Sequence, residues 1–143
     1  LKSHPLRFPC RLAVNCDNPL SRKAALTPED LRGVPFVLMG PDHMTYTRLR
    51  DAFHDAGVPL TARVHSHLFK NLLSFVKLDM GVALVDRFAE DYDGIEGVVL
   101  RPFYPEIHVD MAVVTARGRP LSEVGREFLA VLLNALASDS AEA

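Results

Sequence analysis

Short apolar runs alternate with segments of helical periodicity along most of this chain. Apolar runs bounded by turn residues predict strands, and apolar positions spaced three and four apart predict amphipathic helices. The predicted strands cover residues 10–15, 34–39, 62–65, 82–85, 98–103 and 110–116. The predicted helices cover residues 27–33, 44–56, 67–79, 86–92 and 122–137.

Capping residues support these boundaries. Thr27 is expected to cap the first helix, with Pro28 at its first position, and Ser66 and Asp86 are expected to cap two later ones. Gly81 is a typical helix end. The last helix carries an apolar stripe that we expect to face inward, formed by Val124, Phe128, Val131, Leu132 and Leu136.

The predicted strands at 34–39 and 82–85 are apolar at every position. Such strands are typical of parallel sheets that helices cover on both faces. The alternation of strands and helices favours the same architecture. We therefore expect an α/β fold with a mostly parallel sheet flanked by helices.

Net charge and the absence of a long apolar run argue against two kinds of function, nucleic-acid binding and membrane spanning. The chain has 143 residues, with a formal net charge of −2, and this balance argues against a nucleic-acid-binding surface on the segment. No stretch reaches the apolar length of a membrane span. The start, Leu-Lys-Ser-His-Pro, has neither an initiator Met nor a signal-peptide pattern, so we interpret the chain as a fragment.

The cysteine and histidine side chains are the candidates for disulfide formation and metal binding. Cys10 and Cys16 flank one apolar run, too far apart for a disulfide if that run is extended, and we expect two buried free thiols in a reducing compartment. His65 and His67 would share one strand face, but zinc needs three or four ligands and no third is spaced nearby. We expect no metal, no cofactor and no catalytic residue.

Topology indicates where a ligand would bind. In open α/β sheets, ligands bind beyond the carboxyl ends of the strands. Those ends are residues 15–16, 40–42, 66–67 and 86–87. Ser66 would combine a hydroxyl with the free N–H groups of a helix start, which suits a carboxylate ligand. A plain capping role for Ser66 fits equally well, and the two roles are compatible.

The ordered set of motifs resembles a known family. The stretch Asn18-Pro19-Leu20, continued by residues 26–36, resembles the "HPLA" region of LysR-type transcription regulators. Residues 65–67 and 78–86 resemble their "GlGvailp" segment, and residues 99–103, 120–122 and 128–129 resemble their closing pattern. Residues 81–92 and 97–107 are similar to the branch that senses opines and related amino-acid derivatives. Asp79 departs from the glycine common in the family.

The resemblance implies part of a two-lobed effector-binding domain like the type 2 periplasmic binding proteins. Lobe II would cover about residues 10–117, and about 120–137 would be the return helix of lobe I. The DNA-binding domain would lie outside this chain, which would reach DNA only through that missing domain. The implied effector wall of lobe II is Asn15, Ser66, His67 and Leu68.

The same resemblance implies a cytoplasmic homo-oligomer, a dimer or a tetramer, that binds a small amino-acid-like or carboxylate effector without contact with a membrane. Effector sensing for transcription regulation is thus the favoured function, and the domain is not expected to be an enzyme. Two alternatives stay open: a solute-binding protein of the same fold and, with less support, an amino-acid-pathway enzyme.

Overall fold

The computed structural model describes residues 2–91, 95–118 and 120–140. The chain divides into two compact units. The larger unit runs from Pro9 to Val109, and the smaller one joins residues up to Phe8 with those from Asp110 onward. The predicted helix end at Tyr92 lies outside the described residues.

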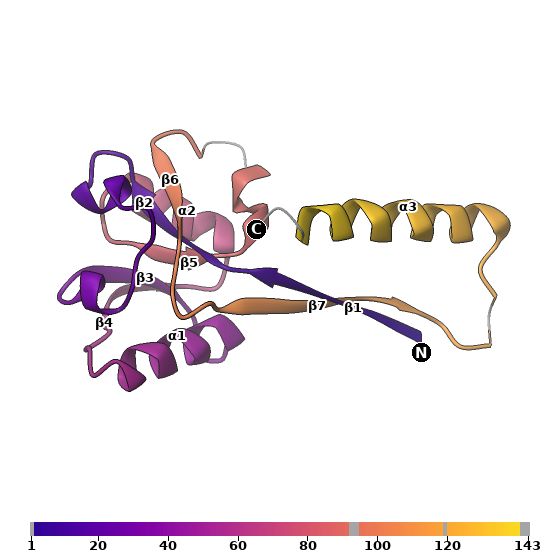
Figure 1. Ribbon diagram of the computed structural model, residues 1–143, viewed down its shortest axis with the longest axis horizontal. Helices are drawn as coiled ribbons and strands as arrows, with labels where there is room; N and C mark the ends of the chain where they lie inside the picture. Colours follow the sequence, from indigo (N-terminus) through magenta and orange to yellow (C-terminus); the bar gives the residue numbers. More distant parts are fainter. Residues whose placement is uncertain (1, 92–94, 119, 141–143) are drawn as a thin grey trace. The chain divides into compact units, whose positions relative to one another are not determined.

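The larger unit contains five of the strands and two of the α-helices seen in Figure 1. They are β2 (Arg11–Asn15), β3 (Pro35–Met39), α1 (Met44–Asp55), β4 (Thr61–Ser66), α2 (Phe69–Lys77), β5 (Ala83–Val85) and β6 (Val98–Pro102). Short 3₁₀ turns occupy Pro19–Arg22, Glu29–Leu31 and Arg87–Asp91. The strands and helices of this unit thus follow the sequence prediction closely, whereas the predicted helices at 27–33 and 86–92 are single turns.

The remaining elements are two paired strands, β1 (Lys2–Pro9) and β7 (His108–Thr115), and the helix α3 (Glu123–Ser140). The pattern did not predict β1, because prolines and basic residues interrupt its alternation. Arg7 forms an ion pair with Asp110 at 3.4 Å between these strands. No helix in the described ranges is both long enough and apolar enough to cross a membrane.

The sheet of the larger unit is mixed. β3 pairs in parallel with β4, and backbone hydrogen bonds between Val82 and both Val37 and Pro35 tie the start of β5 to β3. β2 runs antiparallel to both β5 and β6. The α/β class is confirmed, but the sheet is not mostly parallel. A strand that is apolar on both faces is buried on both faces. This pattern does not indicate whether the strand runs parallel or antiparallel to its neighbours.

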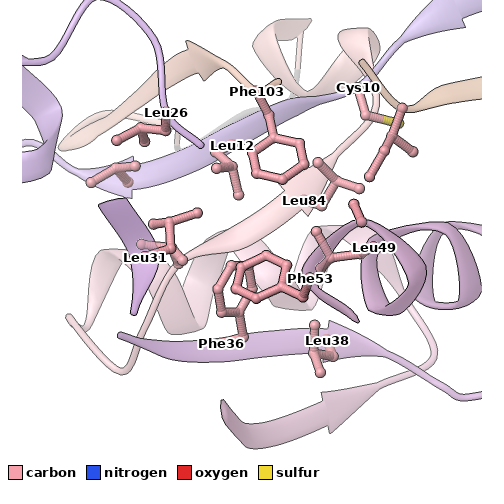
Figure 2. Close-up of a cluster of buried hydrophobic side chains, with 14 of the residues drawn as sticks. Cys10, Leu12, Leu26, Leu31, Phe36, Leu38, Leu49, Phe53, Leu84 and Phe103 are labelled. Carbon is pink, nitrogen blue, oxygen red and sulfur yellow. The ribbon is translucent and has the colours of Figure 1, made fainter. Parts of the chain in front are cut away.

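α1 covers one face of this sheet. Phe53 on α1 meets Phe36 of β3 edge to face, with ring centroids 5.4 Å apart, and lies parallel to Phe103 at 6.3 Å (Figure 2). Leu12 and Leu84 complete the layer beneath them. Alternate strand residues point this way, as the pleat of a strand requires.

α2 covers the opposite face. Its residues Leu72, Leu73 and Val76 are buried against Val37 and Ala83. These residues recur three and four positions apart, which is the spacing of an amphipathic helix, so the helix predicted at 67–79 is confirmed over Phe69–Lys77. Burial of such side chains contributes about 1.5–3 kcal/mol each, which makes the two helix–sheet layers the main source of stability.

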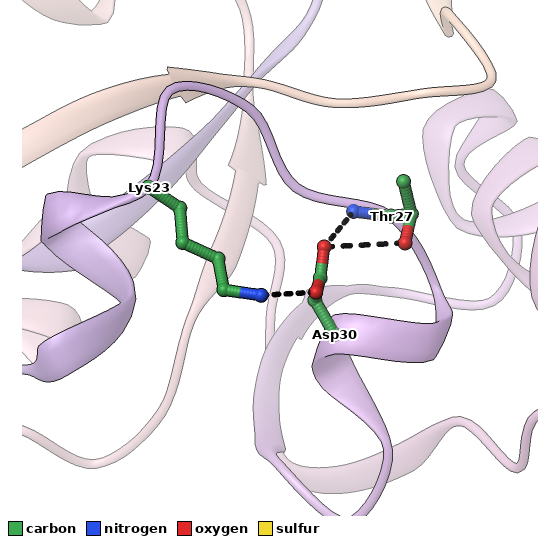
Figure 3. A network of polar contacts seen from close by, with 3 residues as sticks. All are labelled: Lys23, Thr27 and Asp30. Carbon is green, nitrogen blue, oxygen red and sulfur yellow. Dashed lines mark hydrogen bonds and ion pairs between the residues drawn. The ribbon is translucent and has the colours of Figure 1, made fainter.

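The turn at Glu29–Leu31 is held differently from the prediction. Thr27 does not cap it; Pro28 occupies the cap position without a side-chain hydrogen bond. Instead the Asp30 carboxylate accepts hydrogen bonds from the N–H and hydroxyl of Thr27 and forms an ion pair with Lys23 (Figure 3). A carboxylate with three donors holds this segment more firmly than one hydroxyl would.

Two burial predictions were wrong. Cys10 is buried but Cys16 is exposed, so only one of the two free thiols is a core residue. On α3, Val124, Phe128 and Val131 are about two-thirds or more exposed, at 73%, 67% and 67%. The stripe that was expected to face inward therefore has a large apolar surface in contact with solvent.

Candidate functional site

Three strands end at one edge of the larger unit's sheet. β3, β4 and the start of β5 are parallel, so the segments that follow them, beginning at Gly40, His67 and Asp86, leave the sheet together. Because β2 is antiparallel, it meets this edge with its first residues, beside Cys10. We call the segments 40–43, 66–70 and 86–88 the carboxyl edge.

Ser66 lies at the carboxyl edge and is 7% exposed. Its hydroxyl oxygen accepts the N–H of Leu68 at 3.2 Å. α2 begins only at Phe69, with Leu68 as its cap residue, so the prediction that Ser66 caps this helix was wrong. In the described part of the chain, the N–H groups of Phe69 and Lys70 have no acceptor. Ser66 therefore closes a tight turn that leads to two free N–H groups.

His67 and Leu68 follow Ser66 and are exposed; Leu68 is 62% exposed. The His67 ring and the Asp42 carboxylate both lie over Gly40: a methyl group there would stand 2.9 Å from His67 Cε1 and 2.8 Å from Asp42 Oδ1. Both atoms belong to exposed side chains that would have to shift to admit a side chain at residue 40. The structure thus brings Ser66, His67 and Leu68 together beside Gly40 and Asp42.

His43 connects the starts of the two helices. Its Nδ1 accepts the N–H of Thr45 at 3.3 Å, capping α1, and lies 2.7 Å from the Thr45 hydroxyl oxygen. Its ring meets Phe69, the first residue of α2, edge to face at 5.3 Å. His43 was not among the predicted site residues. Its position in the short segment between a buried strand and the next helix was the available signal, but histidine is an uncommon cap.

Asp86 also lies at the carboxyl edge, directly after β5. Its carboxylate accepts the backbone N–H groups of Phe88 and Ala89, so the prediction that Asp86 caps the following turn is confirmed. Burial raises the pKa of this carboxyl above its ordinary value, while those N–H donors and the nearby His43 oppose the shift. Among the described residues, its Oδ1 is buried without a hydrogen-bond partner.

Asn15 lies elsewhere. Its side-chain amide donates to the carbonyls of Lys77 at 3.0 Å and Val76 at 3.4 Å, and its oxygen accepts the N–H of Asp17. It therefore contacts the last residues of α2, whereas Ser66 precedes the first. The expectation that Asn15 and Ser66 share one edge is wrong, because it assumed that β2 runs parallel to its neighbours.

The histidine pair at 65 and 67 has no metal-site geometry. His65 Nδ1 lies 3.4 Å from the Met39 carbonyl oxygen, and its ring rests against Tyr46 at 5.9 Å. Across the described ranges, no three His, Cys, Asp or Glu side chains are grouped to hold an ion.

Burial raises the pKa of the Cys10 thiol to about 12. The charge of Asp86 adds to this shift and that of Arg48 opposes it. The Cys10 thiol therefore stays protonated at neutral pH.

The carboxyl edge has two features that favour an anionic ligand. Free N–H groups and the positive end of the α2 dipole favour a negative group by about 0.3–1 kcal/mol when exposed and by more when partly buried. The Ser66 hydroxyl belongs to the residue two positions before the α2 cap, Leu68. Ligand binding beyond the carboxyl ends of strands is the general behaviour of open α/β sheets.

This α/β architecture is that of the periplasmic-binding-protein-like domains found in transcription regulators. The family model described as the LysR substrate binding domain matches residues 3–137. The chain therefore belongs to the LysR substrate-binding domain family, which confirms the resemblance noted in its motifs.

Individual relatives agree with this membership. The regulatory protein NocR of Agrobacterium tumefaciens (strain T37) is 32% identical over 117 residues, which cover 82% of this chain and 39% of NocR. The chain thus spans about two-fifths of the length of that relative.

Solved structures show the fold. The regulatory domain of CcmR from Synechocystis PCC6803, in complex with 2-PG, has a TM-score of 0.70 at 17% identity, covering 97% of this chain and 66% of that one. HinK, a LysR family regulator from Pseudomonas aeruginosa, has a TM-score of 0.74 at 14% identity, with coverage of 94% and 48%.

Proposed function

We propose that this chain is the effector-sensing part of a LysR-type transcription regulator that binds a small carboxylate, amino-acid-like effector at its carboxyl edge. The observation that carries the proposal is the family match across residues 3–137. The chemistry of the edge agrees with it, because a buried hydroxyl and free N–H groups favour an anionic ligand there.

Relatives of the same fold bind small molecules of this kind. The CcmR regulatory domain holds 2-PG, and the effector binding domain of QuiR, with a TM-score of 0.67 at 10% identity, holds shikimate, a carboxylate. NocR, by its name, is a regulatory protein. These findings support a sensor whose role is to bind and report a metabolite, with no catalytic step and no cofactor.

In this proposal the effector contacts Ser66, His67 and Leu68. Ser66 and the N–H groups of Phe69 and Lys70 hold the anionic group, and the exposed His67 and Leu68 border it. Asn15 has no place in the site, because its amide is engaged at the far end of α2.

We extend the proposal to the wider assembly on the basis of the family match. Residues of about 10–117 form lobe II, about 120–137 form the return helix of lobe I, and DNA binding belongs to a domain outside this chain. The protein works in the cytoplasm as a homo-oligomer, a dimer or a tetramer. The exposed apolar residues of α3, which include Phe128 and Val131, provide surface for packing against the rest of the protein or a second subunit.

Titration of the full-length protein tests this site. A thermal-shift screen of small carboxylates and amino-acid derivatives identifies a ligand. Calorimetry then compares the affinity of wild type and of Ser66→Ala for that ligand. Loss of a charge-assisted hydrogen bond of about 1.5–3 kcal/mol weakens binding roughly tenfold or more. Ser66→Ala also removes the bond to Leu68, costing about 1 kcal/mol of stability, so unfolding without ligand is measured separately.

Ser74→Ala is the matched control. Ser74 is an exposed serine on α2, and its hydroxyl donates to the Lys70 carbonyl at 3.5 Å. Its replacement leaves affinity unchanged. Unchanged affinity in Ser66→Ala, with only a fall in stability, shows that Ser66 is a structural residue and contradicts the proposed site.

A further inference from the structure

We propose that Asn15 is a positioning residue for the effector site: it anchors the far end of α2 and, through the helix, fixes the N–H groups of Phe69 and Lys70 that receive the anion. This inference rests on the proposed function and adds a residue that acts on the site without touching the ligand. Because α2 has nine residues, its two ends lie about 13 Å apart.

The start of α2 has no side-chain cap. Leu68 occupies the cap position, and no side chain of the described residues donates or accepts a capping hydrogen bond there. The buried residues Leu72, Leu73 and Val76 hold the helix against the sheet. Apolar contacts are non-directional, so directional hydrogen bonds add the restraint on movement along the helix axis.

Asn15 supplies such hydrogen bonds at the end of α2. Its amide donates to the carbonyl oxygens of Lys77 at 3.0 Å and Val76 at 3.4 Å, in the last turn, where a helix runs out of its own donors. The Asn15 side chain is itself fixed, because its oxygen accepts the N–H of Asp17 at 2.9 Å. Its backbone is paired with Val98 in the sheet. Asn15 therefore ties the end of α2 to β2.

The turn that closes α2 is weakly favoured without this support. The N–H groups of Asp79 and Met80 donate to the carbonyls of Val76 and Phe75, at 2.9 and 3.0 Å, a helix ending in which the left-handed position is usually glycine. Asp79 takes that position with a φ of 56°, which costs a residue with a side chain more than it costs glycine. Its carboxylate also lies at the negative end of the helix dipole. The donors of Asn15 offset these two costs.

Inorganic phosphate is the probe for the test, because free N–H groups at a helix start bind such anions. Hydrogen exchange of residues 66–70 in the full-length protein is titrated with phosphate at constant ionic strength, which gives an apparent Kd. We expect Asn15→Asp to raise this Kd roughly three- to tenfold. The aspartate still accepts the N–H of Asp17 but cannot donate to the helix carbonyls. Its charge acts little on the phosphate directly, because the ends of α2 are further apart than the screening length of about 8–10 Å.

Asn18→Asp is the matched control. It adds the same charge in the same loop and keeps the side-chain oxygen that accepts the N–H of Leu20 at 3.0 Å, so it leaves the phosphate Kd unchanged. Asp79→Gly provides a rescue. In the Asn15→Asp protein, a glycine at residue 79 relaxes the closing turn and removes its carboxylate, which restores most of the phosphate affinity.

Three results overturn the positioning role while leaving the proposed effector site standing. They are a phosphate Kd that Asn15→Asp leaves unchanged while the free energy of unfolding falls, an equal weakening by Asn18→Asp, and a loss of affinity that Asp79→Gly does not restore. In each case the effect on the site does not pass through the end of α2. A wild-type protein in which phosphate leaves residues 66–70 unprotected overturns both this inference and the proposed site.

Discussion

At the scale of single residues, Asp30 and Asp86 show how the surroundings of a carboxyl group shift its pKa. The hydrogen bond from Lys23, followed by those from Thr27, holds the pKa of Asp30 below its ordinary value of 3.8. Burial does the opposite at Asp86, where the pKa is raised. Asp30 thus stabilises the fold through its charge, whereas burial disfavours the charged form of Asp86.

These shifts predict opposite pH dependences. The contribution of Asp30 is present above its unfolded pKa and is lost as the pH falls through its lowered folded pKa. The cost of ionising Asp86 is relieved as the pH falls from neutral through its raised folded pKa. In urea unfolding, the advantage of wild type over Asp30→Asn, about 0.2–1 kcal/mol for a partly exposed pair, shrinks in acid.

Relative to Asp86→Asn, wild type instead gains stability as the pH falls through the raised folded pKa of Asp86, which lies above the pH range in which the contribution of Asp30 is lost. Parallel pH profiles for the two comparisons would show that the environments of these carboxylates are not as described.

At the scale of elements, periodicity identified most helices and strands but not how they connect. Leu72, Leu73 and Val76 recur at helical spacing, so α2 and its buried face could be predicted. The direction of β2 depends on how residues 16–34 return the chain to the sheet, and no local pattern encodes that path. Asn15 was misplaced for this reason. Ser66, His67 and Leu68 follow one strand directly, so their adjacency needed no knowledge of topology.

Gly81 lies in the turn that connects α2 to β5, and β5 leads directly to Asp86 at the carboxyl edge. Its φ is 153°, and an added Cβ would collide with the Pro35 carbonyl oxygen. Gly81→Ala therefore strains the backbone by about 1–3 kcal/mol and also pushes β5 away from β3. Urea unfolding should show a larger loss than for Gly33→Ala, where φ is 74° but no atom lies within 4 Å of the added methyl. Equal losses would mean that the contact with Pro35 is not limiting.

At the scale of the whole molecule, the sequence indicated the family because its motifs keep their order over the chain. Helical periodicity alone did not predict the solvent exposure of α3, because an apolar stripe indicates that a partner is needed but not whether that partner lies in the same unit. The resemblance did predict an exposed apolar face here, because it implies that this helix returns to lobe I. Val124 and Phe128 keep the spacing of a packing face while remaining exposed. In the larger unit, by contrast, described residues of α1 and α2 cover the two faces of the sheet.

Hydrogen exchange of the full-length protein, with and without an effector found by the thermal-shift screen, tests the central claim most directly. Effector binding at the carboxyl edge slows exchange of the amides in segments 40–43, 66–70 and 86–88, with Phe69 and Lys70 most affected because their free N–H groups gain an acceptor. Residues 15–17 and 76–78, at the opposite end of α2, keep their rates. Protection confined to that opposite end, or no change at 66–70, would contradict the account.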